Sequence, residues 1–98
     1  MLGGSHHPEN PYFLTDVKYL CSDGYPGELV TDEQSCYNAG VLLDYPYGGR
    51  RDANNVPSGC IKYTWNNVLY LNKHTGVRHW KTQQVCKKTG TEKILYLF

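Results

Sequence analysis

Four cysteines constrain this chain more than any other feature. Cys21, Cys36, Cys60 and Cys86 are even in number, widely spaced and contain no C-x-x-C pair. Zinc knuckles and thioredoxin-type redox motifs need such a pair. Disulfides persist in oxidising compartments, whereas four buried free thiols would be the alternative in a reducing one. We therefore predict two structural disulfides and an extracytosolic protein, which is secreted, on a cell surface or in another oxidising compartment.

The length of the chain favours one stapled domain. Its 98 residues suit a single domain, and covalent staples matter at this size because the core of a small domain is limited. Residues 1–10 offer nothing to bury, so we expect a flexible N-terminal arm there and a single disulfide-stabilised domain over residues 11–98. No signal peptide or membrane span is expected, since no long apolar run occurs. Whether the chain is an excerpt of a longer precursor stays open.

Local patterns predict an α+β fold, in which one short helix packs on a small antiparallel β-sheet and two disulfides staple the two together. Thr31 and Gln34 form a T-x-x-Q capping box that starts the helix, and Pro46 stops it near residue 44. An apolar stripe at helical spacing forms the packing face and consists of Cys36, Ala39, Gly40 and Leu43.

Four segments of the chain read as strands. Residues 17–21 alternate apolar and polar, residues 60–65 and 68–72 form a hairpin around Asn66 and Asn67, and residues 83–87 return as a further strand. A two-residue turn pairs Trp65 with Val68 and Tyr63 with Tyr70. Residues 45–59 are expected to form a long surface loop.

The four cysteines allow three pairings. The order of the elements favours Cys36 with Cys60, which ties the helix to the hairpin, and Cys21 with Cys86, which ties the first strand to the last. On the chain-entropy account, the two bridges restrict the unfolded chain by roughly 3.5 and 4 kcal/mol.

No catalytic residue, metal site or cofactor is predicted. His74 and His79 are separated by four residues, and His6 and His7 lie on the arm, so a zinc site would need ligands from distant loops. Bridged cysteines leave no thiol nucleophile. The glycine pair at residues 48–49 lacks the Lys-Thr/Ser that follows in a P-loop.

Aromatic and basic side chains are the candidate binding groups, because exposed rings combine contact area with a polar handle for sugars or proteins. Core packing is the alternative, and we favour it for Trp65, whereas Trp80 lies in a polar stretch and is expected to be exposed. The dibasic pair Arg50 and Arg51 is a processing site, an anion contact or, as we favour, two solvated charges in a loop. The candidate residues are Trp80, Trp65, Tyr63, Tyr70, Arg50 and Arg51.

Charge and the chain's apolar end suggest self-association. Residues 1–59 carry three basic and eight acidic side chains, whereas residues 60–98 carry seven and one. Opposite charges favour head-to-tail contacts, and residues 93–98 (KILYLF) form an apolar strand that pairs within its own sheet or with another subunit. The alternative is that the two halves interleave and mix their charges. Nucleic acid is not an expected partner, because the net charge is only +1.

Several motifs in chain order resemble a small cysteine-bearing module of secreted and surface proteins of algae and other protists. They are C-x2-A at Cys36 and Ala39, P-x-G-C at residues 57–60, V-L-Y-L-N at residues 68–72 and the final Cys86. The resemblance covers roughly residues 21–88. Gly40 and Val41 replace a richer alanine run, and the loop before Pro57 is long. The resemblance implies a disulfide module within larger extracellular assemblies, with no established activity and no catalytic residues.

These observations predict a non-catalytic structural or interaction module outside the cytosol, as part of a larger protein assembly or filament. Its partners are other protein subunits or further copies of the chain. A carbohydrate-binding, lectin-like domain that uses exposed aromatic residues is the alternative. A zinc or thiol enzyme is the third class.

Overall fold

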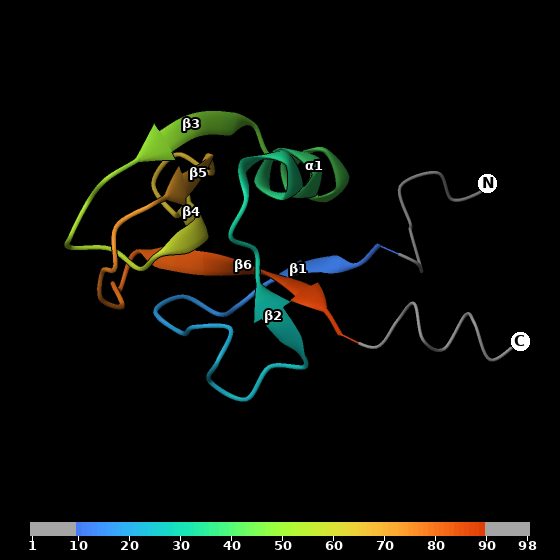
Figure 1. The fold of residues 1–98 in the computed structure, drawn as a ribbon, viewed down its shortest axis with the longest axis horizontal. Coiled ribbons are helices and arrows are strands. Elements are labelled where there is room, and N and C mark those ends of the chain that lie inside the picture. The colour runs from blue at the N-terminus through green and yellow to red at the C-terminus, as the bar shows by residue number, and fades with distance from the viewer. Residues whose placement is uncertain (1–9, 90–98) are drawn as a thin grey trace, which may run out of the picture.

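The computed structural model describes residues 10–89 and consists of one helix and six strands (Figure 1). Almost all of the expected N-terminal arm and the whole of residues 93–98 lie outside the described residues. The elements in chain order are β1 (Tyr12–Leu14), β2 (Gly27–Leu29), α1 (Glu33–Leu43), β3 (Tyr47–Arg51), β4 (Gly59–Tyr63), β5 (Leu69–Asn72) and β6 (Thr82–Lys88).

The strands form one mixed sheet in the order β1-β6-β4-β5-β3, with β2 also paired to β6. All described strand pairs are antiparallel except β3 with β5, which run parallel. The expected α+β class with two disulfides is therefore correct, but the purely antiparallel sheet is not. The reason is the connection over residues 52–58, which carries the chain past β5 to β4. β4 and β5 are antiparallel, and β3 pairs with β5 and not with β4, so β3 and β5 run in the same direction.

Helix α1 has a defined start and stop. Asp32 is the N-cap, and its carboxylate accepts the Ser35 N–H at 2.9 Å, so the cap lies one residue after the expected Thr31. Asp44 ends the helix in the left-handed conformation, and the Tyr45 N–H donates to the Gly40 carbonyl at 2.8 Å. The expected stripe faces inward, with Cys36, Ala39 and Gly40 buried and Leu43 partly buried.

The hairpin of β4 and β5 is present, but its register differs from the expected one. Ile61 pairs with Tyr70 and Lys62 with Leu69, and the Tyr63 N–H donates to the Val68 carbonyl at 3.3 Å. A turn over residues 64–67 replaces the two-residue turn, because the Asn67 N–H closes back on the Tyr63 carbonyl at 2.9 Å. The shift is by two residues, so every side chain keeps its predicted face.

Two other local predictions are wrong. Residues 17–21 form turns, with Lys18 at a φ of 81°, and the strand before them is β1, which pairs with β6. The expected loop over residues 45–59 contains β3. A side chain at Gly48 would collide with the Tyr70 ring, and Gly49 has a φ of 110° where the register with β5 shifts. This glycine pair therefore lets β3 bulge and lie close to β5.

The sheet separates two clusters of buried side chains. The helix-side core packs between α1 and the sheet and consists of Tyr12, Val30, Cys36, Ala39, Cys60, Leu69, Leu71 and Val85. The aromatic-side core lies on the other face of β4 and β5 and consists of Val56, Ile61, Tyr63 and Tyr70. Figure 1 shows α1 on one side of the sheet, beside β3 and β5.

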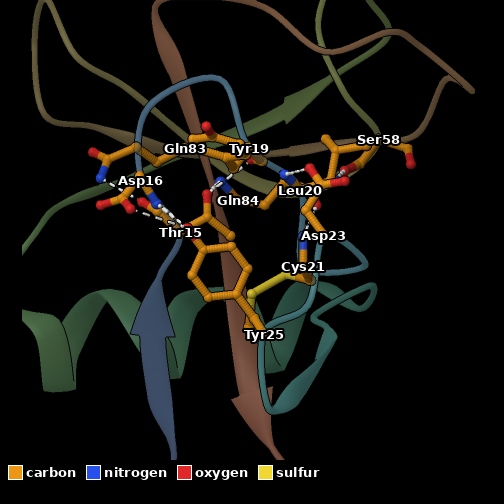
Figure 2. The surroundings of a disulfide bond; sticks show 11 residues. Thr15, Asp16, Tyr19, Leu20, Cys21, Asp23, Tyr25, Ser58, Gln83 and Gln84 are labelled. Atoms are coloured by element: carbon orange, nitrogen blue, oxygen red, sulfur yellow. Dashed lines mark hydrogen bonds between the residues drawn. A yellow bond between two sulfur atoms is a disulfide. The ribbon is translucent and has the colours of Figure 1, made fainter.

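The disulfides join Cys36 to Cys60 and Cys21 to Cys86, which is the pairing that the order of elements favours. The first bridge ties α1 to β4 within the helix-side core. The second ties β6 to the Cys21 loop, residues 15–26, as Figure 2 shows. All four cysteines are bridged, which fits folding in an oxidising environment.

Buried amides hold the loops beside the bridges. Gln84 accepts the Cys21 N–H at 2.7 Å and donates to the Ser58 carbonyl at 2.9 Å (Figure 2). Asn72 accepts the Ala53 N–H and donates to the carbonyls of Ala53 and Pro57, each at 2.9 Å. No buried polar side-chain atom of residues 10–89 lacks a hydrogen-bond partner. Such satisfied networks fix loop geometry, since an unpaired buried group is costly.

Candidate interaction surface

A continuous row of aromatic rings, with a cation toward each end, runs from the aromatic-side core to the outside of the molecule. We call it the aromatic–cationic surface. It is composed of Arg51, Tyr70, Tyr63, Trp65, His79, Trp80 and Lys81. Five of the six binding residues expected from the sequence belong to it, and the exception is Arg50.

The inner part of the row belongs to the sheet. Tyr63 on β4 and Tyr70 on β5 are only 7 % and 9 % exposed, and their ring centroids lie 5.2 Å apart. Burial raises the pKa of Tyr63 above its usual range, so its hydroxyl stays neutral. These two rings are fixed by packing and provide a rigid base for the ring that follows.

Trp65 stacks on Tyr63, with centroids 4.4 Å apart and planes 18° from parallel. It is nevertheless 58 % exposed, so its expected place in the core is wrong. The cause is the turn over residues 64–67, which places Trp65 beyond the end of β4. One face of the indole rests on Tyr63, and much of the ring remains accessible to a partner.

Trp80 and His79 continue the row from the segment that precedes β6. Trp80 is 64 % exposed, as its polar surroundings predicted. His79 lies nearly parallel to Trp80 at 6.1 Å and meets Trp65 edge-on at 6.4 Å. The Lys81 N–H donates to His79 Nδ1 at 3.0 Å, so this nitrogen carries a lone pair and the ring orientation is held by the backbone.

Two cations flank the rings. Lys81 Nζ lies 4.4 Å from the Trp80 centroid and 5.9 Å from that of Trp65, and the Arg51 guanidinium lies 4.3 Å from the Tyr70 centroid. Neither takes part in the two ion pairs found among residues 10–89. Within the described residues, both cations therefore contact aromatic rings, which orient them.

Arg50 takes a different direction from Arg51. It pairs with Glu33 at 3.1 Å, and Glu33 also accepts the Tyr47 hydroxyl hydrogen bond at 2.9 Å. The Arg50 hydrogen bond, followed by that of Tyr47, lowers the pKa of Glu33. Burial, and then Glu33, raise the pKa of Tyr47 to about 12. Successive strand residues point to opposite sides, so Arg50 contacts Glu33 of α1 whereas Arg51 lies over the Tyr70 ring.

An ion pair joins the segment before β6, which carries Trp80, to the Cys21 loop. Arg78 donates to both carboxylate oxygens of Asp23, at 2.9 and 3.3 Å. The Leu20 N–H, followed by Arg78, lowers the pKa of Asp23. The Cys21–Cys86 bridge fixes this loop to β6, and the loop in turn holds Arg78, two residues before Trp80, through Asp23.

The described part of the chain has no cluster of side chains that could hold a metal ion. Residues 10–89 contain no group of three or more His, Cys, Asp or Glu side chains suited to a metal ion. His74 contacts the carbonyl of its neighbour Thr75, and His6 and His7 lie outside the described residues. None of the helices described there is long and apolar enough to cross a membrane.

The acidic and basic parts of the sequence interleave in the fold. Asp23 pairs with Arg78, and Glu28 lies opposite Lys87 in the pairing of β2 with β6. The charge separation along the chain is therefore not kept as two separate surfaces at these places, and it gives little support to head-to-tail contacts.

Sequence reasoning missed two members of the surface. His79 was weighed only as a zinc ligand, and Lys81 was counted only among the charges of the basic part of the chain. The available signal was the order His-Trp-Lys at residues 79–81, which places a second ring and a cation beside the expected exposed indole.

Comparison of the chain with protein-family models, with curated proteins and with solved structures finds no match. The functional assignment therefore depends on the geometry of this chain.

Proposed function

We propose that the chain is a non-catalytic structural or interaction module that works outside the cytosol, as part of a larger protein assembly. It contacts other protein subunits, or further copies of itself, through the aromatic–cationic surface. It uses no metal or cofactor and has no nucleic-acid partner. One observation carries the proposal: two exposed tryptophans share a surface with cations that take part in no ion pair with residues 10–89.

The residue types of this surface support the proposal. Tryptophan, tyrosine and arginine are the side chains that dominate the energy of protein interfaces. The two bridges support an extracellular or otherwise oxidising setting. The resemblance to cysteine-bearing modules of algal and protist surface proteins points to the same kind of assembly.

Sedimentation velocity of the full chain over a range of concentrations tests the contact. We expect association that is weakened in Trp65→Ala and Trp80→Ala and unchanged in Tyr37→Ala. Tyr37 is the matched control, because it is an exposed aromatic residue of α1 outside the row. Equal weakening by all three substitutions, or a monomer at every concentration, would contradict self-association through this surface.

Strand exchange by residues 93–98 is a further proposed route to assembly, and the segment lies outside the described residues. Its deletion separates two roles. Loss of association by an intact, disulfide-bonded monomer would support exchange, whereas unfolding of the monomer would refute it.

Intact mass tests the proposed compartment. Protein isolated without reductant, and with any free thiols blocked, should gain about 4 Da on reduction, which is two hydrogens per bridge. No mass change would indicate free thiols and a reducing compartment.

Carbohydrate binding is the second candidate function, and the exposure of Trp65 favours it. Two accessible indoles within one row offer apolar faces on which sugar rings stack. A glycan array with Trp80→Ala and Trp65→Ala separates the candidates. Sugar binding that is lost in these variants would establish the lectin-like function, and the absence of binding by the unmodified chain would remove it.

A further inference from the structure

We infer that the aromatic–cationic surface binds an acidic sugar polymer, that is, a chain of pyranose rings bearing carboxylate or sulfate groups. The inference rests on the carbohydrate-binding candidate and adds the charge of the ligand to it. It follows from the position of the cations relative to the exposed rings.

The exposed rings provide the stacking contacts. Trp65 rests on Tyr63 and is fixed by it, and His79 lies between Trp65 and Trp80. Rings already held by packing lose little conformational freedom on binding, which favours a ligand that lies along them. A sugar presents apolar C–H faces to such rings and directs its substituents outward from its edge.

Lys81 lies beside the exposed face of the row. Its Nζ lies over the Trp80 ring, 4.4 Å from the centroid, and 5.9 Å from the Trp65 centroid. Trp80 therefore orients the ammonium group toward Trp65, and a sugar stacked on Trp65 would bring its carboxylate or sulfate close to it. Charge-assisted hydrogen bonds are about twice as strong as neutral ones, so an acidic sugar is favoured over its neutral counterpart.

Arg51 supplies a second cation at the inner end of the row. Its guanidinium lies over the Tyr70 ring, 4.3 Å from the centroid, and leaves the ion pairing of this region to Arg50. Arginine binds carboxylate and sulfate groups through paired hydrogen bonds. Two cations along one row match a polymer with repeated charges better than a single anion.

The accessible part of the row consists of the exposed Trp65 and Trp80 and the partly buried His79 and Lys81, at the hairpin turn and in the segment before β6. A sugar polymer that stacks on one ring at a time can bind through these residues alone. A stable protein interface would need further contacts around them, because it buries about 800 Å² on each partner.

Affinity gel electrophoresis of the full chain tests the inference with four probes: polygalacturonate, heparin, dextran and polyglutamate. We expect retardation by at least one of the two acidic glycans and none by dextran. Trp80→Ala and Lys81→Gln should each weaken that retardation by roughly tenfold, the size expected for a dominant interface residue.

Two controls match the substitutions in chemistry but lie elsewhere. Tyr37→Ala removes an exposed ring of α1, and Lys88→Gln removes an exposed cation at the far end of β6. Both should bind within about twofold of the unmodified chain. The affinity for the acidic glycans should decrease as the NaCl concentration rises, because the cations contribute to their binding.

Each other outcome overturns the inference in a distinguishable way. Equal retardation by dextran would show that the surface binds sugars but has no preference for acidic ones. Retardation by polyglutamate alone would identify an acidic protein segment as the partner. Equal losses in Lys81→Gln and Lys88→Gln would show unspecific attraction. No retardation by any probe would refute glycan binding. The sedimentation experiment tests protein contacts separately.

Discussion

The helix-side core and the aromatic-side core lie on opposite faces of β4 and β5, and they are closed by different means. On the helix side, α1 covers the sheet and the Cys36–Cys60 bridge joins the two covalently. On the aromatic side, the loop over residues 52–58 is held by the hydrogen bonds of Asn72. Only the aromatic side continues outward, from Tyr63 to the exposed Trp65.

The difference supports the proposed division of this small domain into one face that stabilises the fold and one face that binds a partner. A covalent staple on one face supplies stability that the limited core of a small chain lacks. The opposite face then needs no helix to cover it, and its rings extend to the surface. The exposed rings of the aromatic–cationic surface rest on the buried tyrosines, and we expect them to contribute little to the stability of the fold.

Removal of the helix-side bridge should have the largest effect. Cys36→Ser/Cys60→Ser opens a loop with a sequence separation of 24, and the chain-entropy account gives a loss of about 3.5 kcal/mol in the free energy of unfolding. Urea unfolding of the oxidised protein measures it. A loss below about 1 kcal/mol would show that packing of α1, and not the staple, closes this side.

The corresponding test on the aromatic side is Asn72→Ala. It leaves the backbone groups of Ala53 and the carbonyls of Val56 and Pro57 without their amide partner. We expect a loss of about 2–3 kcal/mol, since unpaired buried groups retain their desolvation cost. Asn54→Ala, an exposed change in the same loop, is the control. Equal losses in the two variants would mean that the loop does not depend on Asn72.

Acid should weaken both sides through carboxylates whose pKa values are lowered. Hydrogen bonds from Ser35 lower the pKa of Asp32 at the start of α1, and those of Glu33 and Asp23 are lowered as described above. A lowered pKa in the folded state stabilises the fold fully above the unfolded value of about 4. This stabilisation is lost as the pH falls through the lower folded values.

The urea concentration at the unfolding midpoint, measured between pH 7 and pH 2, should therefore decrease once the pH is below about 4. Asp23→Asn should reduce the size of this decrease, because one of the three groups no longer titrates. A midpoint that stays constant or rises on acidification would contradict the assignment.

Lys62 offers a smaller test on the helix side, where it is only 5 % exposed. Burial lowers its pKa, so its charged form costs free energy in the fold at neutral pH, and that cost disappears only as the pH rises through the lowered value. Its partners are the exposed Asn67 amide oxygen at 2.7 Å and the Tyr45 ring.

Lys62→Met should therefore leave the free energy of unfolding unchanged or raise it by up to about 1 kcal/mol. Lys88→Gln, which removes an exposed charge, should have no measurable effect. A clear loss in Lys62→Met would show that the contacts with Asn67 and Tyr45 outweigh the cost of burial.

Patterns within a few residues predicted the elements that local chemistry decides. The stripe from Cys36 to Leu43, the hairpin around Asn66 and the strand carrying Cys86 each have a local signal. The pairing that we favoured among the three is the one in the structure, although Cys21 lies in a loop and not on the expected first strand.

Tertiary contacts and the detailed hydrogen bonding of one turn decided what the sequence did not reveal. β3 looked like a loop, because its two glycines have low strand propensity and serve the approach of β5. The hairpin register depended on hydrogen bonds of Asn66 and Asn67 that no spacing rule gives. Trp65 looked like a core residue, since its exposure depends on the length of that turn.

The urea unfolding of Trp65→Ala/Trp80→Ala, compared with that of Leu69→Ala, tests most directly whether support and recognition are separate. Leu69 is fully buried in the helix-side core, and its truncation should cost about 2–5 kcal/mol. The account predicts a loss of about 1 kcal/mol or less in the double tryptophan variant, because both indoles are largely exposed and lose only ring and cation contacts with Tyr63, His79 and Lys81. A loss as large as that of Leu69→Ala would contradict it, because the aromatic–cationic surface would then be part of the core.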